Sequence, residues 1–231
     1  MTVFWGMLLA HLLTDFVFKR KEVYGASFGY IAFSGFLYFA VLALCCFKFL
    51  SATWFELPFL TLNGWSVIAI AAFIYFLANL YGKYFSVPQR LRFPFFIFRQ
   101  TAYLLFLFIL SPVLPFEGNF VHYMLGPDLL IIANSCLIVT FGFSAFLVAL
   151  SYSLNDGVCN QGLFDKRFLN MLFRLIIFLF LIIPGILFPA MAFILVILAA
   201  YYGLFKDEKK YLYTGCIMTA AFAFLIRGVF C

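Results

Sequence analysis

Residues 2–21 read TVFWGMLLAHLLTDFVFKRK, and this stretch contains the pattern that decides the fold. An apolar run is followed directly by three basic residues, Lys19, Arg20 and Lys21. A cleavable signal peptide carries its basic residues before the apolar run, so the order here argues against one. Basic residues after an apolar run are typical of a membrane helix that ends in the cytoplasm. The stretch therefore predicts a first membrane helix whose N-terminus is non-cytoplasmic.

The same alternation of apolar runs and basic residues continues along the chain. Basic residues follow the third, fifth and seventh apolar runs, and the connections between carry almost none. These residues are Lys83, Arg90 and Arg92, then Lys166 and Arg167, then Lys206, Lys209 and Lys210. Because Lys and Arg mark cytoplasmic loops, the pattern predicts that both termini lie on the non-cytoplasmic side.

Composition indicates that lipid is the solvent of this chain. Its 231 residues are 67% hydrophobic and 10% charged, whereas soluble domains are nearer to half apolar and a quarter charged. The net charge of +6 lies at the ends of the apolar runs, where lipid headgroups bind it, so we expect no nucleic-acid partner. The six cysteines contain no C-x-x-C pair, which argues against a zinc or iron–sulfur site. We expect a lipid bilayer as partner, and no metal or other cofactor.

The hydrophobic pattern predicts an all-α fold, a polytopic transmembrane helical bundle of about eight membrane helices in a single domain, 1–231. The predicted helices are 2–18, 26–48, 65–83, 94–114, 128–152, 168–184, 187–205 and 211–230. The run 168–205 is too long for one span of about 20 residues. Pro184, Gly185 and Pro189 lie in its middle, so we expect two short helices joined by a tight hairpin.

Two connections without Lys or Arg are also rich in apolar and aromatic residues. Residues 51–64 contain Trp54 and Pro58, and residues 116–127 contain Tyr123. Because Trp and Tyr suit the headgroup level, we expect both connections along the outer membrane surface.

Several ionisable or polar residues lie inside predicted helices, where such groups are costly and usually partnered or functional. His11 and Asp15 are four residues apart, which places them on one helix face. Six others lie toward the predicted cytoplasmic ends of their helices: Asn79, Lys83, Arg99, Gln100, Tyr103 and Arg174. Groups at one depth on several helices can converge. We therefore predict one polar cluster in which Asp15 pairs with Lys83 or Arg99.

Residues 8–22, LLAHLLTDFVFKRKE, resemble the opening of a bacterial membrane family known only as domain-of-unknown-function family 3307. Members of that family carry an H-x-x-x-D helix before a basic turn, and later helices with H-x-x-x-D and D-Q-x-x-H. An acidic–Arg pair and a closing Y-x-x-x-G run follow. The corresponding positions in this chain are Asn79–Lys83, Arg99–Tyr103, Phe173–Arg174 and Tyr211–Gly215. The resemblance implies a bacterial inner membrane, with an organellar membrane of bacterial ancestry as the alternative.

The departures from the family pattern change the chemistry of the cluster. His and Asp are good metal ligands and proton carriers, whereas Lys and Arg repel a divalent cation. Only His11 and Asp15 are kept here, and two ligands rarely suffice for a protein metal site. The replacements suit an internal ion pair completed by hydrogen bonds.

Three functions remain open at this point. We favour a non-catalytic subunit or scaffold of a larger membrane assembly, which would associate with other membrane protein subunits. The second is an intramembrane enzyme, metal-dependent or not, that uses His11 and Asp15. The third is a small transporter or ion conduit, which requires polar groups spread across the membrane depth or repeat symmetry. Only Asn134 and a few Ser and Thr residues lie near mid-depth, so this function has the least support.

Overall fold

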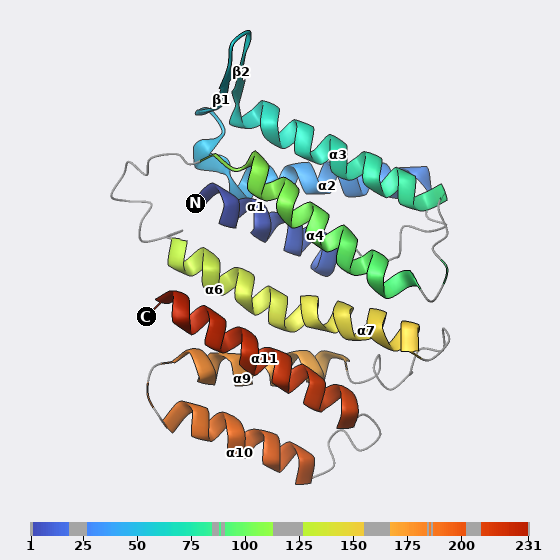
Figure 1. The fold of residues 1–231 in the computed structure, drawn as a ribbon. Helices are drawn as coiled ribbons and strands as arrows, with labels where there is room; N and C mark the ends of the chain where they lie inside the picture. Colours follow the sequence, from blue (N-terminus) through green and yellow to red (C-terminus); the bar gives the residue numbers. More distant parts are fainter. Residues whose placement is uncertain are drawn as a thin grey trace. The chain divides into compact units, whose positions relative to one another are not determined.

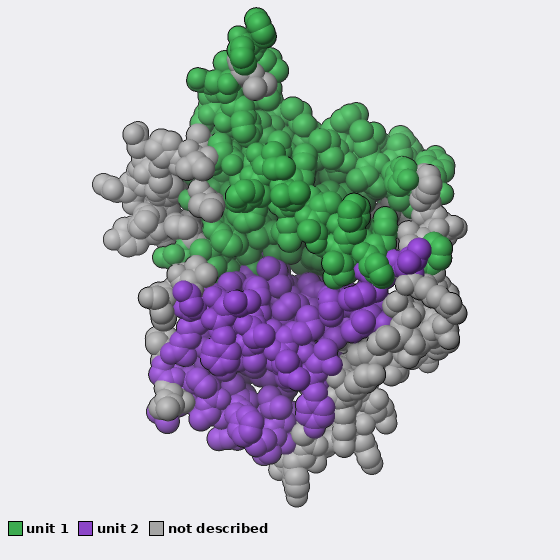
Figure 2. Space-filling model, viewed as in Figure 1, with its two compact units in different colours: residues 1–88, 94–134 green, residues 89–93, 135–231 purple. Residues whose placement is uncertain are grey.

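The computed structural model is mostly helical across the residues that it describes (Figure 1). These residues are 2–18, 27–84, 88, 91–112, 127–154, 167–183, 185, 187–201 and 209–230. The chain divides into two compact units, which Figure 2 shows in different colours. Unit 1 comprises Met1–Pro88 and Pro94–Asn134, and unit 2 comprises Gln89–Phe93 and Ser135–Cys231. That residues 1–231 act as one membrane domain stays a prediction.

The described residues of unit 1 form four helices and the start of a fifth. They are α1 (Thr2–Leu12), α2 (Phe28–Cys45), α3 (Gly64–Tyr84), most of α4 (Arg92–Leu110) and most of α6 (Pro127–Leu137). A π-helix, η1 (Leu13–Phe18), continues α1 without a break. A 3₁₀ turn, η2 (Phe47–Phe49), follows α2.

The longer segment of unit 2 begins at Ser135 in the last turn of α6, which continues into a second π-helix, η4 (Ile138–Gly142). The other helices among its described residues are α7 (Phe143–Leu154), α9 (Arg167–Ile182), α10 (Leu187–Tyr201) and α11 (Lys209–Phe230). Gly185 has φ of 126° and lies between α9 and α10, so the helix break predicted at this point is present. Positive φ is the backbone region that glycine adopts at no steric cost.

Each of the eight predicted helices falls on a helix, or on contiguous helices, of the described residues. Four of them are long and apolar enough to cross a membrane: Phe28–Cys45, Gly64–Tyr84, Phe93–Leu110 and Asp128–Ser151. The other four apolar segments are shorter, at 10–17 residues: Thr2–Phe18, Phe168–Ile182, Leu187–Ala199 and Tyr213–Gly228. Many large apolar side chains stay exposed on these helices, which indicates a membrane protein whose helices contact lipid.

A small antiparallel sheet corrects the expectation of a purely helical fold. Strands β1 (Thr53–Leu57) and β2 (Leu60–Asn63) form a hairpin between α2 and α3 (Figure 1). The sequence Thr-Trp-Phe is rich in the β-branched and aromatic residues that favour strands. Strands of four and five residues are too short for an unambiguous alternation pattern, which is why the hairpin was not predicted.

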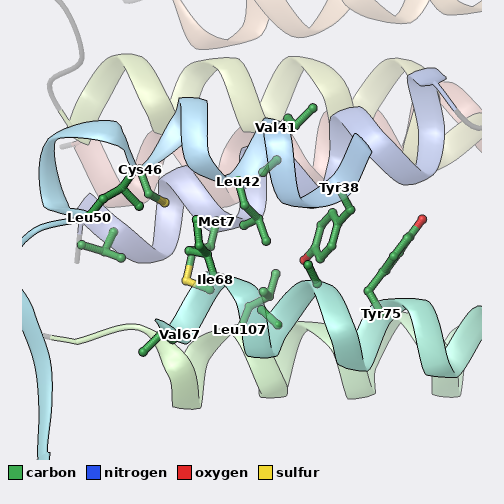
Figure 3. Packing of buried hydrophobic residues seen from close by; sticks show 14 of the residues in the cluster. Met7, Tyr38, Val41, Leu42, Cys46, Leu50, Val67, Ile68, Tyr75 and Leu107 are labelled. Atoms are coloured by element: carbon green, nitrogen blue, oxygen red, sulfur yellow. The ribbon is translucent and has the colours of Figure 1, made fainter. Parts of the chain in front are cut away.

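The core of unit 1 is formed by apolar side chains from α1, α2, α3 and α4 (Figure 3). Met7, Leu42, Ile68 and Leu107 meet there, and all four are fully buried. In a membrane, lipid tails are as apolar as these side chains, so van der Waals packing rather than burial from water stabilises the contact. Unit 2 has its own core, which includes Phe178.

The predicted basic loops lie largely outside the described residues. The basic residues that the structure does not describe are Lys19, Arg20, Lys21, Arg90, Lys166 and Lys206. Of the connection 116–127, residues 116–126, with Tyr123, also lie outside the described residues.

Candidate functional site

The first polar centre begins at the junction of α1 and η1. His11 lies in the last turn of α1, and Asp15 lies in the π-helical turn that follows. A π-helical turn holds more residues than an α-helical turn, and such turns are frequent at functional sites. Both side chains are buried.

The Asp15 carboxylate accepts hydrogen bonds from three side chains on α3 and α4. Its Oδ1 accepts from the Tyr75 hydroxyl at 3.1 Å. Its Oδ2 accepts from Gln100 Nε2 at 3.1 Å and from Arg99 Nη2 at 3.2 Å. The predicted ion pair of Asp15 with Arg99 is therefore present. The carboxylate side chain is only 2% exposed, whereas the Arg99 side chain is 35% exposed.

Gln100 connects His11 to this carboxylate. Its Oε1 lies 3.2 Å from His11 Nε2, while its Nε2 donates to Asp15. Because the amide oxygen can only accept, His11 must carry its proton on Nε2 in this arrangement. The result is a chain of hydrogen bonds from imidazole through amide to carboxylate.

Two further predicted residues complete this centre. The Tyr103 ring packs against the His11 imidazole, with 4.9 Å between ring centroids. Asn79 is also buried, on α3. Tyr75 was missed by the sequence analysis, although it lies four residues before Asn79 and so on the same helix face.

Lys83 is not the partner of Asp15, so that alternative was wrong. Its Nζ lies 5.5 Å from the centroid of the Tyr84 ring. Lys83 is eight residues beyond Tyr75, which corresponds to about 12 Å along the axis of α3. Since Tyr75 contacts the carboxylate directly, a lysine two turns further along cannot reach it.

Arg174 has its own set of partners in unit 2, and its side chain is buried. Its Nε donates to the Asn170 carbonyl at 3.2 Å. Its Nη2 donates to the Thr140 carbonyl at 3.2 Å and to Ser144 Oγ. Thr140 lies in the π-helix η4. Gly215 leaves room for this arginine, since a Cβ there would lie 3.2 Å from Arg174 Cδ.

Both polar centres thus coincide with a π-helical turn. Asp15 lies in η1, and the carbonyl of Thr140 in η4 accepts from Ser144 Oγ at 2.6 Å as well as from Arg174. A π-turn changes the backbone hydrogen-bond spacing, which no periodicity of apolar residues reveals. This is why the sequence did not predict the roles of Thr140 and Ser144.

The chemistry available at the first centre follows from the donors that surround the carboxylate. Both Asp15 oxygens already accept hydrogen bonds, and one of the donors is the guanidinium of Arg99. A divalent metal would have to displace these donors and would be repelled by Arg99. Among the described residues, no group of three or more His, Cys, Asp or Glu side chains is placed to hold a metal ion.

Comparison with known proteins gave no match, either to a family model, to a curated protein or to a solved structure. The fold and the two centres define a helical membrane protein with buried, hydrogen-bonded charges.

Proposed function

We propose that this chain is a membrane protein with eight helical spans that acts as a non-catalytic subunit or scaffold of a larger membrane assembly. The observation that carries this proposal is the saturation of Asp15 by three donors from two other helices. A carboxylate used this way fixes the packing of α1 and η1 against α3 and α4. Satisfied buried networks rigidify a structure and specify one arrangement of its helices.

Of the four shorter apolar segments, Thr2–Phe18 comes nearest to the length of a membrane span. The segment Thr2–Phe18 has 17 residues, or about 26 Å of helix, close to the hydrocarbon thickness of about 30 Å. Local thinning of the bilayer and polar residues at helix ends accommodate a short span. The basic residues after alternate apolar runs support non-cytoplasmic termini. The family resemblance supports a bacterial inner membrane.

The second candidate is the intramembrane enzyme, because one observation favours it. The π-helix at Asp15 and the link from His11 through Gln100 resemble the hydrogen-bonded relays of catalytic sites. The two candidates differ in what Asp15 must do. A scaffold needs its hydrogen bonds, and an enzyme needs its charge in the reaction.

Purification in mild detergent after cross-linking in the native membrane separates these functions. We expect other membrane proteins to accompany the tagged chain at a constant molar ratio, with only substoichiometric metal in the same sample. A single chain with stoichiometric metal, lost in Asp15→Asn, would contradict the subunit proposal and support the enzyme. A single chain without metal would also contradict it. Lys83→Gln is the matched control, because it also removes a charge but lies outside the hydrogen bonds of Asp15. It should leave the co-purifying proteins and the metal content unchanged.

A further inference from the structure

The β1–β2 hairpin has a rigid root at the junction of α2 and α3. Trp54 Nε1 donates to the Phe49 carbonyl at 2.7 Å, and Trp65 N donates to the Leu50 carbonyl at 3.2 Å. Gly64 lies so close to this turn that a Cβ there would be 2.7 Å from both the Phe49 oxygen and Leu50 Cα. The direction of the hairpin is therefore set by tertiary contacts at its root.

The hairpin projects crosswise to the helices of unit 1. It leaves the first residue of α3 at a steep angle to that helix in Figure 1, and it forms the protrusion of unit 1 in Figure 2. If α2 and α3 cross a membrane, a hairpin that leaves their ends crosswise runs along the membrane surface. A loop that projects into the water would instead continue the direction of the helices.

The two faces of the hairpin differ in polarity. Phe55 pairs with Leu62 across the strands, and Glu56 pairs with Thr61. Directly opposed residues share a face and successive residues alternate, so the first pair forms an apolar face and the second a polar one. Phe55 and Leu62 pack against the core of unit 1, whereas Glu56 and Thr61 are exposed. The apolar face therefore lies on the side of the helices.

The tip and the surroundings of the root carry the residues typical of a membrane interface. Phe59 at the tip is 100% exposed, and Leu60 beside it is also exposed. Near the root, Phe47, Lys48 and Trp65 are exposed. Aromatic side chains and lysine at helix ends mark the headgroup level, where lysine also binds anionic lipid.

We infer that the hairpin is an interfacial anchor, with Phe59 inserted into the lipid of the leaflet at which α2 ends and α3 begins. This inference rests on the proposed membrane-spanning arrangement. Lipid is favoured over a protein strand added to the hairpin edge, because strand addition uses main-chain groups and needs no aromatic tip. In this arrangement the apolar tip meets lipid and the apolar face packs against the core of unit 1, while Glu56 and Thr61 face water.

Site-specific photo-cross-linking of the purified full chain in phosphatidylcholine–phosphatidylglycerol vesicles tests the anchor. The cross-linking amino acid p-benzoylphenylalanine replaces one residue at a time: Phe59 at the tip, Thr61 on the polar face, or Phe73 on the exposed face of α3. Phe59 is fully exposed, so its replacement leaves the core intact. We expect lipid adducts by mass spectrometry at Phe59 and Phe73, and a yield several-fold lower at Thr61.

The three positions distinguish the failure of the anchor from the failure of the membrane arrangement. Lipid adducts at Phe73 without lipid adducts at Phe59 would overturn the anchor alone. No lipid adduct at either position would overturn the membrane arrangement and the anchor with it. Adducts from Phe59 to a second copy of the chain, or equal lipid yields at Phe59 and Thr61, would also overturn the anchor.

Discussion

Removing either charge of the Asp15–Arg99 pair should destabilise the chain, and Arg99→Gln should cost more than Asp15→Asn. The asymmetry follows from the exposure of the two side chains, 2% for the carboxylate and 35% for the guanidinium. Arg99→Gln removes the guanidinium from a carboxylate that stays buried. Asp15→Asn leaves a cation that is partly exposed, so water or lipid headgroups can compensate its charge.

The expected magnitudes follow from this difference. Removing one partner of a fully buried pair costs about 3–5 kcal/mol, and Tyr75 and Gln100 still donate to the carboxylate. We therefore expect about 3 kcal/mol for Arg99→Gln. Partly exposed pairs contribute about 0.2–1 kcal/mol, and one neutral hydrogen bond about 1 kcal/mol. Asp15→Asn should thus cost about 1–2 kcal/mol.

Thermal unfolding in mild detergent, followed by tryptophan fluorescence, measures both variants. For a chain of this size about 1 kcal/mol corresponds to a shift of about 2–4 °C in Tm. The double variant Asp15→Asn/Arg99→Gln replaces two charges by two amides and should cost less than the sum of the single changes. We expect a coupling free energy on the order of 1 kcal/mol, within the range found for polar contacts between membrane helices.

Lys83→Gln is the matched control, because it removes a cation that does not contact Asp15. Its Tm should stay within about 2 °C of the wild type. If Asp15→Asn is as destabilising as Arg99→Gln, or if the two changes are additive, the buried Asp15 carboxylate does not rely on the charge of Arg99 and the reasoning is wrong.

Two further predictions concern backbone packing and the second centre. Gly64→Ala should cost about 1–3 kcal/mol of stability, because the added Cβ would overlap backbone atoms at the hairpin root. At Gly82 an added Cβ meets no atom within 4 Å, so Gly82→Ala should stabilise α3 by about 0.5–1 kcal/mol. Equal Tm values for the two variants would contradict this packing. Ser144→Ala removes one acceptor from the buried Arg174 guanidinium and should lower stability by about 1–3 kcal/mol in the same unfolding assay. An unchanged Tm would show that Ser144 contributes nothing to holding Arg174.

The helices were predictable because they depend on local features of the chain. Apolar runs of near-membrane length indicate helices wherever they occur. The break at Gly185 follows from residues that cannot continue a helix. The hairpin 53–63 was missed for the opposite reason. Its strands are short, and its direction depends on the contact of Trp54 with the Phe49 carbonyl.

The polar residues of the first centre were predictable in kind but not in arrangement. Few ionisable groups lie inside apolar runs, so the sequence alone limited the partners of Asp15 to Lys83 and Arg99. It did not reveal that Tyr75 donates to the carboxylate or that Gln100 connects it to His11. Those roles depend on how α3 and α4 pack beside Asp15, which leaves no mark on the hydrophobic pattern.

By itself, then, the sequence determined the class of protein, since composition and the length of apolar runs leave lipid as the only suitable solvent. It also determined that a buried aspartate needs a cation. Only the tertiary structure decided which of the two predicted cations pairs with Asp15, because the pairing depends on how far α1, α3 and α4 are shifted along their axes relative to one another. The 12 Å or so of helix between Tyr75 and Lys83 removes one candidate, and the position of α4 supplies Arg99.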